Sequence, residues 1–157
     1  MKKRAMVAAA GVMLLGAVCG AAQTNPQDRG YWRAATNTTE KMTAEIAIAE
    51  MKVTLNTTTF PVVPVRKLKP AEVTALFDAD VNAGISGNLY GLHVRGGTRI
   101  VEHSTLCGDE ETRWMATYVT GRTLQVAFFS GDDPPEFTFD AISNSTTLCA
   151  RYTYTRE

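Results

Sequence analysis

The alternation of side chains in the second half of the chain most constrains the fold. Over residues 113–120 every second side chain falls on the same side, the pattern of a β-strand with two distinct faces. Gly121 and Arg122 then turn the chain. Residues 124–129 return as a mostly apolar strand, which we expect to be central and buried on both faces.

Further strands are predicted on both sides of this pair. Residues 89–94 and 98–102 are expected to form a hairpin, with Gly96 and Gly97 as its two-residue turn. The last strand is expected over residues 148–155. Hairpins that follow one another along the chain make a mostly antiparallel sheet.

One helix is predicted near residues 70–80. Pro70 suits the first helical turn, and Glu72 is favourable at the N-terminal end of a helix. The apolar residues at 73, 76 and 77 share one face. The residues Asn82-Ala83-Gly84 are expected to end the helix.

Residues 43–65 are compatible with two interpretations. Residues 40–51 are rich in helix formers, which favours a helix. The later alternation of apolar residues and the many threonines favour extended backbone. We predict two or three strands, and Pro61 and Pro64 indicate that one of them lies at an edge.

The N-terminus has the order of a secretory signal peptide. Residues 2–4 are basic, residues 5–18 carry no charge, and small residues occupy positions 20–22. We expect cleavage after Ala22, which removes residues 1–22. An uncleaved anchor is disfavoured because the apolar run is short for a membrane span. Lipid attachment at Cys19 is a minor alternative, because the residues before it do not match a lipoprotein signal.

The remaining chain is long enough for one domain. The full sequence has 157 residues, and we divide it into the signal peptide 1–22, a flexible N-terminal segment 23–41 and a single β-rich domain 42–157. Removing three basic residues from 16 leaves 13 against 16 acidic residues, a net charge of −3. That balance provides no basic field to hold nucleic acid.

Cleavage leaves two cysteines, Cys107 and Cys149. In an oxidising compartment an even pair is expected to form a disulfide. Closing a loop of this length stabilises a fold by about 4 kcal/mol on the chain-entropy model. The predicted fold class is therefore mainly β, or α+β: an antiparallel sheet or small barrel with one short helix and one disulfide.

Several short runs are similar to a group of small exported proteobacterial proteins of unknown function. The similarity covers about residues 43–155. It is carried by the order Thr105-Leu106-Cys107-Gly108, Trp114-Met115-Ala116, Val126-Ala127-Phe128-Phe129-Ser130-Gly131 and Leu148-Cys149. The resemblance implies a periplasmic or secreted setting and the cysteine pair, and it implies no activity.

Residues 86–90 also resemble a motif of periplasmic inhibitors of c-type lysozyme, which are small disulfide-linked β-barrels. The shared residues are Ser86, Gly87 and Tyr90. In that family the loop inserts into the lysozyme cleft, so the resemblance implies a candidate binding loop. The alternative is that glycines bend the chain between helix and strand while Tyr90 packs inward. The family's second motif has no clean counterpart here.

The polar residues indicate no metal site and no catalytic group. His93 and His103 could lie near each other, but no third ligand is spaced to join them. The acidic runs 109–111 and 132–133 are interpreted as solvated turns. No nucleophile elbow, phosphate-binding glycine loop or His-Glu-x-x-His motif occurs.

These observations predict a small exported protein without a cofactor that is not an enzyme. We expect it to bind another protein of the cell envelope through loops on a β scaffold. No nucleic-acid partner and no membrane span in the mature chain are expected. The alternatives are an inhibitor of an exogenous enzyme such as c-type lysozyme, and an enzyme with scattered catalytic residues.

Overall fold

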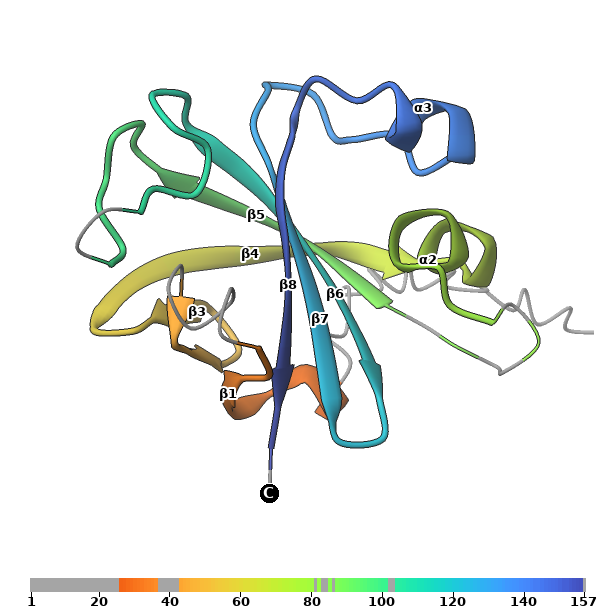
Figure 1. The fold of residues 1–157 in the computed structure, drawn as a ribbon, viewed down its shortest axis with the longest axis horizontal. Helices are drawn as coiled ribbons and strands as arrows, with labels where there is room; N and C mark the ends of the chain where they lie inside the picture. The colour runs from red at the N-terminus through yellow and green to blue at the C-terminus, as the bar shows by residue number, and fades with distance from the viewer. Residues whose placement is uncertain are drawn as a thin grey trace, which may run out of the picture.

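The computed structural model describes residues 26–36, 43–80, 82, 85, 87–101 and 104–156. Eight antiparallel strands follow one another around a closed barrel, each paired with its sequence neighbour, and β1 pairs with β8 (Figure 1). The strands are β1 (Gly30–Ala34), β2 (Glu45–Ile48), β3 (Lys52–Leu55), β4 (Thr58–Leu68), β5 (Gly87–Val94), β6 (Thr112–Thr120), β7 (Thr123–Phe129) and β8 (Leu148–Thr155). The helices are the 3-10 turn η1 (Pro26–Asp28), α2 (Pro70–Phe77) and α3 (Phe139–Ser143).

The predicted fold class is confirmed, as are the strands over residues 43–65 and the Cys107–Cys149 disulfide, whose Cα atoms lie 5.0 Å apart. The edge position predicted from Pro61 and Pro64 is wrong, because β4 pairs with β3 on one side and with β5 on the other. The predicted strands over 113–120, 124–129 and 148–155 correspond to β6, β7 and β8. The disulfide joins the β5–β6 connection to the first half of β8. It therefore fastens this long connection to the barrel wall.

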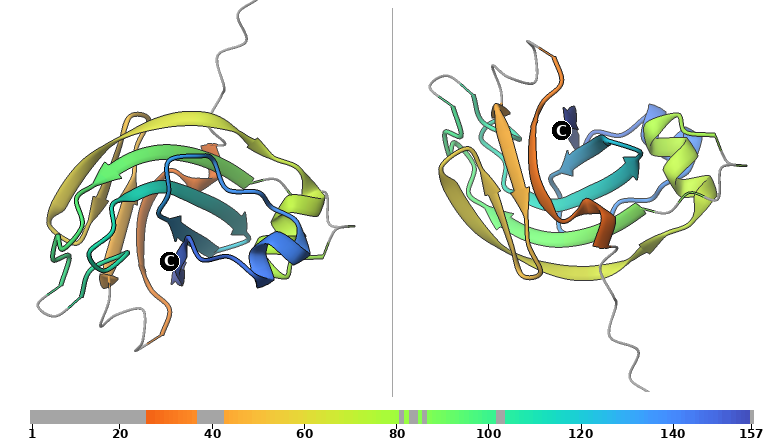
Figure 2. Two further views of the ribbon diagram at one scale, coloured as in Figure 1. Left: turned by 90° about the horizontal axis from the view of Figure 1, so that it is seen from above. Right: turned by 90° about the horizontal axis from the view of Figure 1, so that it is seen from below.

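Two hydrophobic cores lie on opposite sides of the sheet. Inward side chains, among them Trp32, Tyr90, Met115, Phe128 and Tyr154, fill the barrel. Outward side chains of β5 to β7 pack beneath α2 and α3, which lie side by side against the outside of the barrel (Figure 2). The strand β7 is therefore buried on both faces, as its apolar sequence predicts.

The helix α2 begins as predicted and ends earlier than predicted. Pro70 opens it, and the Lys69 backbone N–H donates to the Glu72 carboxylate at 2.7 Å. It ends at Asp78, which has a left-handed backbone with φ of 54°, rather than at residues 82–84. The short helix α3 has no counterpart in the prediction.

The predicted hairpin at Gly96 and Gly97 is wrong. Residues 98–100 form no strand, and β5 pairs with β6 instead. Gly96 and Gly97 do form a tight turn, because the Thr98 backbone N–H donates to the Arg95 carbonyl at 3.1 Å, but no paired strand follows it. Gly96 also permits a close backbone approach to the disulfide-bonded loop, because a Cβ at that position would lie 1.8 Å from the Asp109 carbonyl oxygen.

The prediction of a flexible segment over 23–41 is also wrong for the described part of it. The turn η1 and strand β1 belong to the barrel, so the domain begins before residue 42. Trp32 is fully buried, and its indole N–H donates to the Asp28 carbonyl at 3.1 Å. Residues 1–22, including the predicted signal peptide and Cys19, lie outside the described residues.

Candidate functional site

The candidate binding loop from the sequence is not a loop. Gly87 and Tyr90 lie in β5 and are buried, and Ser86 lies outside the described residues. Tyr90 points into the barrel, since it alternates with outward residues along the strand. The prediction that Gly87 and Tyr90 belong to a protruding binding loop is therefore wrong. The alternative, that Tyr90 packs inward, is confirmed.

Tyr90 belongs to a buried polar cluster around Asp28. The Asp28 carboxylate oxygen Oδ2 accepts hydrogen bonds from the Asn88 amide at 2.7 Å, the Tyr90 hydroxyl at 2.8 Å and the Thr117 hydroxyl at 2.7 Å. Burial and the nearby Asp28 charge hold the pKa of Tyr90 well above its ordinary value, so this hydroxyl stays a donor. The cluster attaches η1 to β5 and β6 inside the barrel.

The barrel interior is occupied by side chains. The largest fully buried residues include Trp32, Tyr90, Tyr154, Phe128 and Leu55, all inside the barrel. An eight-stranded barrel can either fill its interior with side chains or hold one small ligand. Here the inward side chains fill the interior, so a binding site is expected in a pocket on the outer surface.

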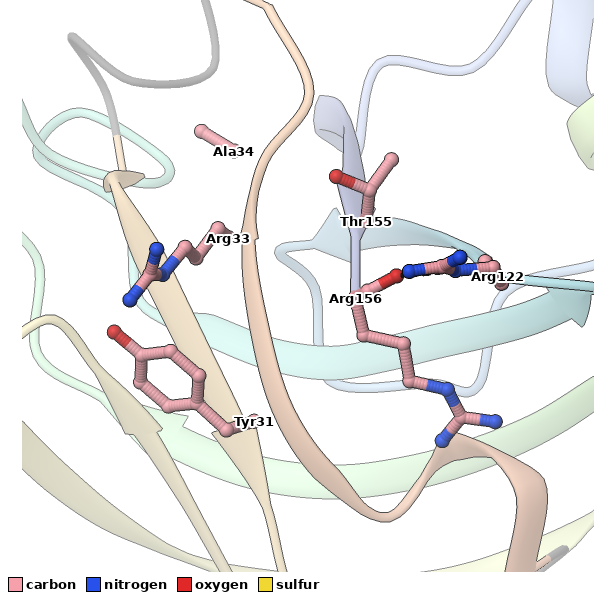
Figure 3. A pocket seen from close by; sticks show the side chains of 6 residues that line it. All are labelled: Tyr31, Arg33, Ala34, Arg122, Thr155 and Arg156. Atoms are coloured by element: carbon pink, nitrogen blue, oxygen red, sulfur yellow. Dashed lines mark hydrogen bonds between the residues drawn. The ribbon is translucent and has the colours of Figure 1, made fainter.

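A surface pocket of about 740 Å³ lies where β1 meets β8, and we call it the seam pocket. It is lined by Tyr31, Arg33, Ala34, Arg122, Thr155 and Arg156 (Figure 3). The strands β1 and β8 supply most of the lining, and the β6–β7 turn supplies Arg122. Among the residues that the structure describes, two residue pairs join β1 to β8, so the seam is a short ladder.

Backbone and aromatic contacts hold two of these arginines. The Arg122 side chain donates through Nε to the Arg156 carbonyl at 2.9 Å. The Arg156 guanidinium lies over the Trp32 ring, 4.4 Å from its centroid, and also donates to the Gln27 carbonyl at 3.5 Å. A cation placed over an indole is attracted to the negative face of the ring. Arg156 therefore covers the buried Trp32 while it lines the pocket.

Tyr31 and Arg33 form the other side of the pocket. Tyr31 is 47% exposed, and the Arg33 guanidinium lies 5.9 Å from its ring centroid. The pKa of Tyr31 is raised above its ordinary value, mainly by its hydrogen bond with Glu45. Glu45 is also the partner of Arg33 in the β1–β2 register, so this side is less positive than the Arg122 side.

The charge of the seam pocket favours anions. All three charged lining residues are arginines, and none of them forms an ion pair within the described part of the chain. Guanidinium groups bind carboxylates and phosphates through paired hydrogen bonds. Sequence reasoning missed this site because its arginines come from three distant parts of the chain, none of them in a basic run.

The other polar candidates lie at the opposite end of β6 and β7. Arg113 bridges Glu111 at 2.9 Å and Asp132 at 3.2 Å, and His93 lies 3.6 Å from Glu111. His103 lies outside the described residues. Among the residues that are placed, no three His, Cys, Asp or Glu side chains form a group that could hold a metal ion.

No family model matches the chain, and neither the curated proteins nor the solved structures contain a match to it. Among the described residues, no helix is long and apolar enough to cross a membrane.

Proposed function

We propose that this chain is a small exported, non-catalytic binding protein that binds an acidic segment of another protein in the cell envelope. The observation that carries the proposal is the seam pocket, an open surface hollow whose charged lining residues are all arginines. Side chains fill the barrel interior, which favours recognition on the outer surface. The disulfide is compatible with an oxidising compartment outside the cytoplasm.

An acidic protein segment fits the chemistry of the pocket. Carboxylates along an acidic segment would meet Arg122 on one side of the pocket and Arg33 on the other, while Tyr31 offers a half-exposed aromatic contact. Tyrosine and arginine are, with tryptophan, the residue types enriched among those that carry binding energy at interfaces. The rigid barrel holds these groups in place before the partner arrives, which lowers the entropy cost of binding.

A peptide titration tests this function. Hexaglutamate carrying a fluorophore is titrated with periplasmically expressed protein at low salt, and anisotropy reports binding. Because an exposed ion pair contributes about 0.2–1 kcal/mol, Arg122→Ala is expected to weaken binding up to about fivefold. Adding Arg33→Ala should weaken it further.

The matched control is Arg99→Ala. Arg99 is exposed in the β5–β6 connection and lies outside the pocket. This variant should bind hexaglutamate like the wild type, and hexalysine should bind none of the proteins. Equal affinity of the wild type and the Arg33→Ala/Arg122→Ala variant would contradict the proposal.

A further inference from the structure

A second pocket of about 390 Å³ lies on the outer face of β4, β5 and β6, and we call it the Trp114 groove. In the cyclic strand order β5 is four strands from β1, so the groove lies across the barrel from the seam pocket. It is lined by Pro61, Val63, Gly91, Leu92, His93, Arg113, Trp114 and Asp132. Its volume is within the range of roughly 300–1,000 Å³ that small-molecule sites occupy.

Gly91 opens this groove. Gly91 pairs with Val63 on one side and Trp114 on the other, so all three positions face outward. A Cβ at Gly91 would lie 3.8 Å from the Trp114 ring atom Cζ3 and 3.9 Å from a Val65 methyl. Without that side chain, the flank of the indole is left uncovered. Pro61, Val63 and Leu92 add an apolar lining beside the indole, and Val63 is 58% exposed.

The groups around the groove are held in fixed positions. The Trp114 indole N–H donates to the Gly131 carbonyl at 3.0 Å, which fixes the ring. Arg113 lies between the carboxylates of Glu111 and Asp132, and His93 stands beside Glu111. The pairing of β5 with β6 shifts register between Gly91 and Val94, and such bulges re-aim side chains next to binding sites.

The polar rim of the groove, formed by Arg113, Asp132 and His93, contains both hydrogen-bond donors and acceptors. Its charges nearly balance, whereas the charged residues of the seam pocket are all arginines. A guanidinium donates only, a carboxylate accepts only, and a hydroxyl does both. A ligand with many hydroxyls around a ring with apolar C–H faces would satisfy the rim and cover the aromatic floor together. We propose that the Trp114 groove binds a neutral saccharide unit, with its ring against Trp114 and its hydroxyls toward Arg113, Asp132 and His93.

An NMR titration tests the proposal, because the chain has only two tryptophans. Trp32 is fully buried, so the two indole N–H signals report an inner and an outer site, and Trp114→Phe assigns them. The probes are maltotriose and triacetylchitotriose. We expect the Trp114 signal to shift with a Kd of about 1 mM for at least one of them, while the Trp32 signal stays in place.

Substitutions at Gly91 supply the control. Gly91→Leu fills the groove and should weaken saccharide binding by at least about tenfold, or roughly 1.4 kcal/mol. Gly91→Ala adds only ordinary contacts and should change binding less than about threefold. The Arg33→Ala/Arg122→Ala variant should bind saccharide like the wild type, which separates this test from that of the proposed function.

Three results would overturn the proposal. The first is the absence of a Trp114 shift with both saccharides, and the second is unchanged binding by folded Gly91→Leu. In the third, N-acetyl-leucine amide shifts the Trp114 signal where the saccharides do not, which would assign the groove to an apolar side chain of a protein partner. If Gly91→Leu does not fold, Arg113→Ala replaces it and should also weaken saccharide binding.

Discussion

Replacing Asp28 by alanine is expected to destabilise the barrel more than any exposed substitution. The carboxylate is 1% exposed and accepts three hydrogen bonds, from Asn88, Tyr90 and Thr117. A hydrogen bond to a charged group contributes about 1.5–3 kcal/mol, and each buried donor left unsatisfied costs about 1–3 kcal/mol. Alanine also removes the cost of burying a charge, which offsets part of the loss.

The net effect of Asp28→Ala is therefore a loss of about 3–5 kcal/mol in the free energy of unfolding. Asp28→Asn keeps one acceptor oxygen without the charge and should cost about 2 kcal/mol. Tyr90→Phe removes a single donor and should cost about 1–2 kcal/mol. In the double variant, Tyr90→Phe should cost less than it does alone, because its acceptor is already absent.

Urea denaturation followed by the fluorescence of the two tryptophans, of which Trp32 is fully buried, measures these changes. Asp133→Ala is the control, since Asp133 is exposed and should change stability by less than about 0.5 kcal/mol. The reasoning is refuted if Asp28→Ala costs less than about 1 kcal/mol, or if the effects of Asp28→Ala and Tyr90→Phe are strictly additive.

Three other predictions concern the disulfide, the start of α2 and export. Replacing Cys107 or Cys149 by serine should lower stability by roughly 2–5 kcal/mol, and the unreduced, unfolded mature protein, cleaved after Ala22, should show no free thiol in a thiol titration. Hydrogen bonding to Arg66 lowers the pKa of Glu72 from its ordinary 4.5, so this carboxylate stabilises the fold above that value and the contribution is lost as pH falls below it. Glu72→Gln should therefore narrow the stability difference between neutral and acidic pH in denaturation experiments, and an unchanged difference would contradict the assignment. N-terminal sequencing of the protein from the periplasm should show a mature chain that begins near Gln23, and full-length protein retained in the cytosol would contradict export.

Sequence reasoning predicted the elements that local patterns determine. Residues 113–129 alternate and turn within a short stretch, and Pro70 and Glu72 mark a helix start by their own chemistry. The disulfide followed from the parity of the cysteines left after the predicted cleavage. Each of these inferences depended on neighbours in sequence or on a simple count, so the three-dimensional fold was not needed.

The remaining features depend on contacts between distant segments. Asp28 looks like an ordinary loop aspartate in the sequence, and its partner Thr117 lies 89 residues away. The strand β1 is short and places one large apolar side chain, Trp32, inside the barrel, so it shows no clear alternation. The seam pocket exists only because the barrel closes and brings Arg33, Arg122 and Arg156 to one surface.

Amide chemical-shift mapping with unlabelled hexaglutamate tests the central claim, that the seam pocket is the binding surface, most directly. We predict that the largest shifts fall on β1 and on residues 121–123 and 153–156, and that they diminish as salt screens the charges. Shifts confined to Arg95 and Arg99, or the absence of any shift at low salt, would contradict the claim.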